Sequence, residues 1–150
     1  MDDQRKLQTI DDLIDPCKDV SPDFYPGEKF GYSNQGYRLL GKIIEIVRGV
    51  TYEEYLRQNI FEPLGMRHSG LDNDQRIIKS RASGYNYDGG SLTNARYSDM
   101  LMFAPYAAGG IYSSVEDLYL WDQVLYTERL LKKESIDKMF LPYSDEDHGY

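Results

Sequence analysis

The sequence predicts a mainly α-helical fold with long irregular loops and at most a small β-hairpin. Apolar residues recur at steps of three and four in several segments, which is the pattern of helices with one apolar face. Residues that cap helix N-termini precede two of these segments, at Thr51 and Ser114. Glycine interrupts the region 64–112, where no helical period can be followed. With 41% hydrophobic and 28% charged residues, the 150-residue chain is expected to be globular.

The longest helical pattern begins after a turn formed by Pro26, Gly27 and Gly31. Six apolar or aromatic residues then recur at helical spacing: Tyr37, Leu39, Leu40, Ile43, Ile44 and Val47. This pattern predicts a helix over 35–48 with a buried face. Gly49 follows as a left-handed C-cap, and Arg48 suits the last turn of the helix.

The remaining helices are expected at 3–14, 52–60, 115–126 and 133–140. Thr51 and Glu54 have the spacing of a capping box at the start of the second of these helices. Pro63 is expected to end that helix, because proline disfavours helical backbone in the residue before it. Ser114 is expected to cap the helix over 115–126.

The glycine-rich region between these helices offers one signal for β structure. Tyr85-Asn86-Tyr87 is followed by Asp88-Gly89-Gly90, which is typical of a strand leading into a tight hairpin turn. Any β structure is therefore expected to be minor and to lie between residues 80 and 112.

Composition excludes several classes of function. The net charge of −8 argues against a general nucleic-acid partner or an anionic-membrane surface. No apolar run is long enough to span a membrane. The chain has a single cysteine, Cys17, which excludes an internal disulfide. It has only two histidines, which argues against a histidine-rich metal site. We therefore expect no metal and no cofactor; localisation stays open.

Tyr32-Ser33-Asn34 stands immediately before the longest predicted helix. Residues two apart point about 200° apart on a helix but to the same side of an extended segment. Tyr32 and Asn34 can therefore serve one site only if they lie on the loop that enters the helix. The alternative is that Ser33 or Asn34 merely caps the helix while Tyr32 packs in the core.

Two stretches carry a family resemblance: PGEKFGYSNQGYRLLGKIIEIVRGVTYEEYLRQNIFEPLGM from Pro26 and AAGGIYSSVEDL from Ala107. Together they resemble serine β-lactamase-like hydrolases, the superfamily of class C β-lactamases, penicillin-binding DD-peptidases and related esterases. The resemblance covers most of residues 22–150. It implies the helical lobe of the β-lactamase/transpeptidase-like α+β fold. It also implies that Tyr32 is the catalytic tyrosine and Asn34 the substrate-side asparagine.

Enzymes of this kind also use a Ser-x-x-Lys and a closing Lys- or His-x-Gly. Ser135 to Lys138 and His68 to Gly70 match these patterns, but Ser-x-x-Lys should precede Tyr-x-Asn and here it follows. Ser135 falls among charged residues, as on a solvated helix, and His68 falls in a turn. Neither match is interpreted as catalytic, so we expect no nucleophile in this chain.

The sequence is therefore interpreted as a single domain, 1–150, excised from the helical lobe of a larger hydrolase. Its partner would be the missing sheet-containing lobe of that protein. The whole enzyme would act on a β-lactam, a D-Ala-D-Ala or other peptidoglycan-like peptide, or a small ester. The isolated chain is expected to be inactive. The alternative is a non-catalytic helical binding module derived from the same family.

Overall fold

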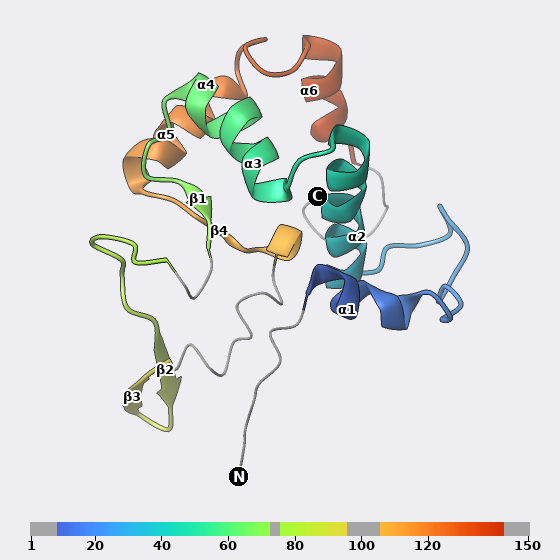
Figure 1. Cartoon of the computed structure of the whole chain (residues 1–150), viewed down its shortest axis with the longest axis horizontal. Coiled ribbons are helices and arrows are strands. Elements are labelled where there is room, and N and C mark those ends of the chain that lie inside the picture. The colour runs from blue at the N-terminus through green and yellow to red at the C-terminus, as the bar shows by residue number, and fades with distance from the viewer. Residues whose placement is uncertain (1–8, 73–75, 96–105, 143–150) are drawn as a thin grey trace.

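The computed structural model describes residues 9–72, 76–95 and 106–142, and helices dominate it (Figure 1). The helices are α1 (Ile10–Ile14), α2 (Asn34–Arg48), α3 (Tyr52–Leu56), α4 (Glu62–Leu64), α5 (Val115–Val124) and α6 (Lys133–Met139). Short 3₁₀ turns add Asp15–Cys17 and Tyr106–Ala108. The predicted mainly α fold is confirmed. Of the helix expected over 3–14, residues 3–8 lie outside the described part.

Both ends of α2 follow from local sequence. Ser33 is extended, and its Oγ accepts the Gly36 N–H at 3.0 Å, which caps the helix. The helix therefore begins at Asn34, one residue before the predicted start. Gly49 has φ +69° and ends the helix in the left-handed conformation, as predicted.

The predicted burial of the apolar face of α2 is wrong for this structure. Leu40, Ile43 and Val47 are 55%, 52% and 72% exposed. The buried residue of α2 is Gly41, which faces Tyr106 and Ala107. Periodicity identifies which face of a helix is apolar, but it does not show whether other parts of the protein cover that face.

Pro63 does not end the helix that starts after Thr51, so that prediction is also wrong. Helix α3 widens into a π-helical turn, Arg57–Phe61, and continues as α4 until Gly65, where φ is +75°. Pro63 is the second residue of α4, the helix directly after the π-helical turn. The Thr51 cap is confirmed, since its Oγ1 accepts the Glu54 N–H at 3.1 Å.

The core lies where α3, α4 and α5 meet. Its buried side chains are those of Tyr52, Leu56, Phe61, Leu64, Met66 and Val124. Trp121 of α5 and Ile44 of α2 pack against this cluster while remaining partly exposed. None of the helices in the described part of the chain has the length and hydropathy that a bilayer span requires.

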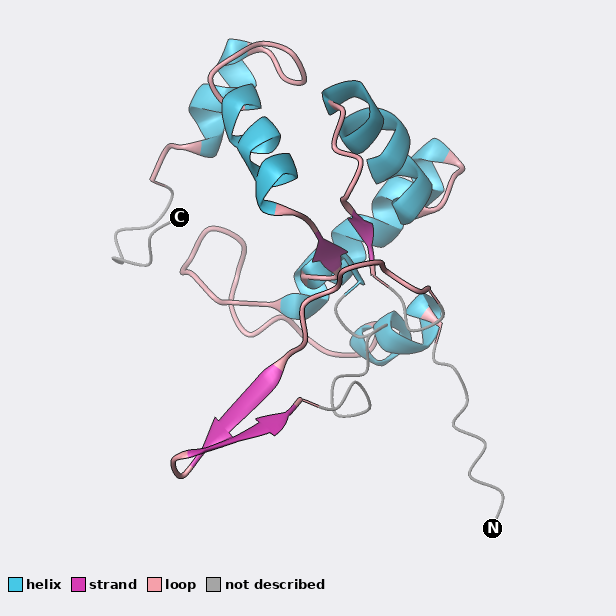
Figure 2. Ribbon diagram, turned by 90° about the vertical axis from the view of Figure 1, so that its left-hand side faces the viewer, coloured by secondary structure: helices cyan, strands magenta, loops and turns pink. Residues whose placement is uncertain are grey.

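The predicted hairpin is present. β2 (Tyr85–Asp88) pairs antiparallel with β3 (Ser91–Asn94), and Gly89 and Gly90 supply positive φ at the turn. Figure 2 shows this hairpin extending away from the helices.

A second antiparallel pair was not predicted. β1 (Gly70–Leu71) pairs with β4 (Ile111–Tyr112), so β1 lies outside the range 80–112 in which strands were expected. Two-residue strands that pair across a long stretch of sequence leave no periodic pattern of their own.

Candidate active site

Tyr32 and Asn34 are brought together at the entry to α2. The Tyr32 hydroxyl donates a hydrogen bond to Asn34 Oδ1 at 2.8 Å. Tyr32 lies on the loop as predicted, whereas Asn34 is already the first residue of the helix. Because the intervening Ser33 is extended, with φ −145° and ψ 106°, the two side chains reach the same side of the chain.

Different side chains cap α2 and form the Tyr32–Asn34 hydrogen bond. Ser33 supplies the helix cap, so the Asn34 side chain is not used for that purpose. Tyr32 is 69% exposed, so its ring does not pack in the core that the described residues form. An exposed hydroxyl next to an exposed amide is an arrangement that can contact a bound molecule.

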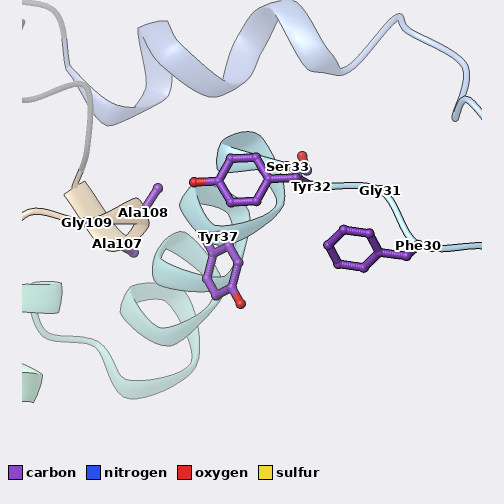
Figure 3. A pocket seen from close by; sticks show the side chains of 8 residues that line it. All are labelled: Phe30, Gly31, Tyr32, Ser33, Tyr37, Ala107, Ala108 and Gly109. Carbon is purple, nitrogen blue, oxygen red and sulfur yellow. The ribbon is translucent and has the colours of Figure 1, made fainter. Parts of the chain in front are cut away.

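A pocket of about 400 Å³ opens beside this pair. The residues that line it are Phe30, Gly31, Tyr32, Ser33, Tyr37, Ala107, Ala108 and Gly109 (Figure 3). One wall is aromatic and comes from the loop before α2 and the first turn of that helix, and the other is built of small residues. In Figure 3 the Tyr32 hydroxyl points toward the segment Ala107–Gly109. No lining residue is an acid or a basic residue.

The small-residue wall is fixed by close packing and backbone hydrogen bonds. A Cβ added to Gly41 would lie 2.5 Å from a Tyr106 ring carbon, so glycine permits the 3₁₀ turn Tyr106–Ala108 to reach α2. Gly110 donates to the Tyr106 carbonyl at 2.9 Å, and its own carbonyl accepts the Asp72 N–H at 2.7 Å. The sequence indicated only a turn here and gave no signal for a pocket wall.

Tyr106 anchors that wall as a neutral phenol. Burial, and then the nearby Glu45 carboxylate, raise the pKa of Tyr106 well above its usual value. Its ring packs on Tyr52, with centroids 5.0 Å apart. Glu45 is partly buried, and its carboxylate accepts the Tyr52 N–H at 2.9 Å. Tyr106 is therefore a packing residue, whereas Tyr32 and Tyr37, which line the pocket, are exposed.

The Ser135-x-x-Lys138 match lies on α6. Ser135 is exposed, and the Lys138 Nζ pairs with Glu134 at 3.1 Å. A second pair on the same helix joins Lys133 to Asp137 at 2.8 Å. These i,i+4 pairs are those of a solvated helix face, as the sequence indicated.

The His68-Ser69-Gly70 match forms a turn that leads directly into β1. It is held by Asp117 of α5, which is only 3% exposed. Asp117 Oδ2 accepts the His68 N–H and the Ser69 hydroxyl, both at 2.7 Å. The sequence placed Asp117 only near the start of α5 and gave no sign of these distant contacts.

Comparison with known proteins identifies the family. Residues 1–147 match the sequence profile of the family described as Beta-lactamase. The chain belongs to the Beta-lactamase family. A relative with 34% identity over 94% of the chain is the putative penicillin-binding protein PbpX of Bacillus subtilis (strain 168). The resemblance carried by the two stretches that begin at Pro26 and at Ala107 is therefore confirmed at the level of the superfamily, which is one of serine hydrolases.

Solved structures of Beta-lactamase family proteins share the fold. The octameric penicillin-binding protein homologue from Pyrococcus abyssi is 37% identical over 95% of this chain, with a TM-score of 0.75. The D-amino acid amidase from Ochrobactrum anthropi SV3, complexed with L-phenylalanine amide, is 26% identical over 87% of it, with a TM-score of 0.74.

The chain spans only part of these family members. It covers 35% of PbpX, 32% of the Pyrococcus abyssi protein and 39% of the amidase. The chain therefore has between about a third and two fifths of the length of these proteins.

Proposed function

We propose that this chain is the helical lobe of a serine hydrolase and contributes two groups to its active site. Tyr32 would transfer the proton, and Asn34 would bind the substrate. The observation that carries this proposal is the 2.8 Å hydrogen bond between their exposed side chains, of which that of Tyr32 lines the pocket. The match to the Beta-lactamase family supports the same assignment.

The chemistry follows from the two groups. A phenol can take the proton of a nucleophilic hydroxyl and deliver it to the leaving group. With an ordinary pKa near 10, a tyrosine needs a nearby cation to act as a base at neutral pH. When Asn34 Oδ1 accepts from Tyr32, its Nδ2 can donate to a substrate carbonyl.

The nucleophile and the cation would come from outside this chain. In this proposal Tyr32 transfers the proton and Asn34 binds the substrate, so neither is the acyl acceptor, and Ser135 and Lys138 lie on the solvated helix α6. A Ser-x-x-Lys supplied by the rest of the polypeptide would provide both groups beside Tyr32.

The exposed face of α2 supports a missing lobe as the partner of this chain. Its apolar side chains, each at least 40% exposed, are those of Tyr37, Leu39, Leu40, Ile43, Ile46 and Val47. Contiguous apolar surface of this kind marks an interaction site. Because the chain spans about a third of PbpX, we assign this face to the rest of the same catalytic domain.

The substrate would be an acyl compound: a β-lactam, a D-Ala-D-Ala or other peptidoglycan-like peptide, or a small ester. The pocket wall of Ala107, Ala108 and Gly109 leaves room for a substrate group and offers it no charge. Related proteins are named for penicillin binding and for the amidase reaction, which supports acyl transfer as the common chemistry.

The test is a search for a covalent acyl-enzyme. The complete polypeptide that contains this sequence, and the 150-residue chain alone, are incubated with a chromogenic cephalosporin and with p-nitrophenyl acetate. Mass spectrometry is expected to find an adduct on a Ser-x-x-Lys serine of the complete polypeptide and none on the chain alone.

Two results would overturn the proposal. An adduct on Ser33 or Ser135 that disappears on substitution by alanine would place the nucleophile in this chain. A complete polypeptide that binds these compounds but never forms an adduct would favour a non-catalytic binding module.

A further inference from the structure

Asp117 is a buried carboxylate at the N-terminal turn of α5. It is 3% exposed, and a buried carboxylate is strongly destabilising unless hydrogen bonds compensate it. Its Oδ2 accepts two of them, from the His68 N–H and from the Ser69 hydroxyl, each at 2.7 Å. The Ser69 hydroxyl oxygen also lies 2.7 Å from Ser113 Oγ, just before α5. One side chain thus fastens the turn at 67–69 to the start of α5.

This turn is connected to the pocket by an unbroken series of backbone pairings. Ser69 leads into β1, whose Gly70 pairs with Tyr112 and whose Leu71 pairs with Ile111. The next amide, Asp72 N–H, donates to the Gly110 carbonyl at 2.7 Å. Gly110 follows directly on Gly109, the last of the three small residues in the pocket wall.

The cluster around Asp117 cannot work as a second nucleophilic site. His68 Nδ1 lies 4.0 Å from Asp117 Oδ1, which is too far for a hydrogen bond. Ser69 is bonded to the carboxylate directly, so no imidazole stands between them to accept its proton. In a triad the histidine occupies that intermediate position.

We propose that Asp117 is a positioning residue for the pocket, a role that rests on the proposed hydrolase function. By holding His68 and Ser69, it fixes β1 against β4 and so sets where Ala107, Ala108 and Gly109 stand relative to Tyr32. Substrate binding depends on Asp117 through this wall, whereas proton transfer at Tyr32 on the opposite wall does not.

The experiment compares Asp117→Ala, Asp117→Asn and the control Glu116→Ala. Glu116 is the preceding residue of α5 and is exposed, so its substitution removes a charge at nearly the same place. Asn retains one acceptor and adds a donor that can face Ser69 Oγ.

Hydrogen exchange on the 150-residue chain supplies the first readout. In Asp117→Ala the amides of His68, Asp72 and Gly110 are expected to exchange at least about tenfold faster, because a buried hydrogen-bond network is broken. The Gly49 amide, bonded to Glu45 at the end of α2, reports on a distant helix and should keep its rate. Asp117→Asn should recover most of the loss, and Glu116→Ala should match wild type.

Acylation kinetics of the complete polypeptide supply the second readout. Asp117→Ala is expected to raise KM for a cephalosporin by at least about threefold while kcat and its pH profile stay within about twofold. Equal acceleration of exchange at Gly49 and at Gly110, or a KM like that of Glu116→Ala, would overturn the positioning role. A wild-type enzyme with no acylation would instead overturn the proposed function itself.

Ser69→Ala provides a second variant if Asp117→Ala does not fold. It removes one of the two hydrogen bonds to Asp117 and leaves the charge in place. The same local exchange pattern and the same rise in KM are expected, at reduced size. Unchanged exchange at His68 and Asp72 in this variant would also overturn the inference.

Discussion

Gly41 of α2 lies directly against Ala107 of the pocket wall. A Cβ built on Gly41 would stand 2.6 Å from the Ala107 Cβ, closer than real Cβ atoms approach. The helix that begins at the Tyr32–Asn34 pair therefore carries, two turns later, the contact that positions the opposite wall. The contact between α2 and this wall therefore depends on a residue that has no side chain.

Gly41→Ala is expected to lower the free energy of unfolding by about 1–3 kcal/mol, because overpacking outweighs the gain in helix propensity. The control is Gly36→Ala in the same helix, where the nearest atom to an added Cβ is 3.6 Å away. That change should leave stability unchanged or raise it by up to about 1 kcal/mol. Urea unfolding of both variants measures the difference, and equal midpoints would contradict the tight contact.

Tyr32→Phe is expected to slow acylation of the complete polypeptide by about 10² to 10⁴-fold, the usual contribution of a general acid–base group. Stability should fall by no more than about 0.5–1.5 kcal/mol, because one exposed hydrogen bond is lost. Tyr37→Phe removes a hydroxyl from the same pocket and should acylate normally. If Tyr32→Phe acylates within twofold of wild type, the hydroxyl has no role in proton transfer.

Ser33→Ala and Asn34→Ala should affect different properties, the first the stability of the chain and the second its KM for substrate. Ser33 caps α2, so its loss is expected to reduce the free energy of unfolding by about 1 kcal/mol. Asn34 makes no cap, and its loss should leave the melting temperature almost unchanged while KM for substrate rises. Melting curves and steady-state acylation on both variants check this, and a lower melting temperature for Asn34→Ala would show that its role is structural.

The stability of the chain should depend on the Tyr106 hydroxyl at alkaline pH. Burial, and then the Glu45 carboxylate, raise the pKa of Tyr106 in the folded state. A raised pKa means that the stability is fully present below the unfolded-state value, about 10, and is lost as the pH rises beyond it. Unfolding at pH 8 and pH 11 should therefore separate wild type from Tyr106→Phe, which should lose less stability over this interval. Equal losses would exclude this linkage.

Local features of the sequence predicted local features of the structure well. The Ser114 cap, the Gly49 C-cap and the hairpin at Gly89 each depend on residues within one turn, and each is present. Pro63 was misjudged because the π-helical turn before it changes the register of the helix, which no single residue signals.

Features that join distant segments could not be predicted in the same way. The pairing of β1 with β4 and the contacts of Asp117 link residues that are far apart in the sequence. That Tyr32 and Asn34 can reach one site was predicted, because the two residues flank a single extended residue, Ser33. The wall opposite them depends on Gly41 meeting Ala107, a contact that a single sequence does not reveal.

The uncovered face of α2 also governs how this chain behaves in solution. Ile46 and Val47 are each 72% exposed, so each copy of the chain carries apolar surface that favours self-association. Electrostatic repulsion between copies of like charge opposes this association. The net charge of −8 provides this repulsion at neutral pH, and it vanishes near the isoelectric point of about 4.7. Mild acid or high salt should therefore precipitate the chain at concentrations that remain clear in dilute neutral buffer.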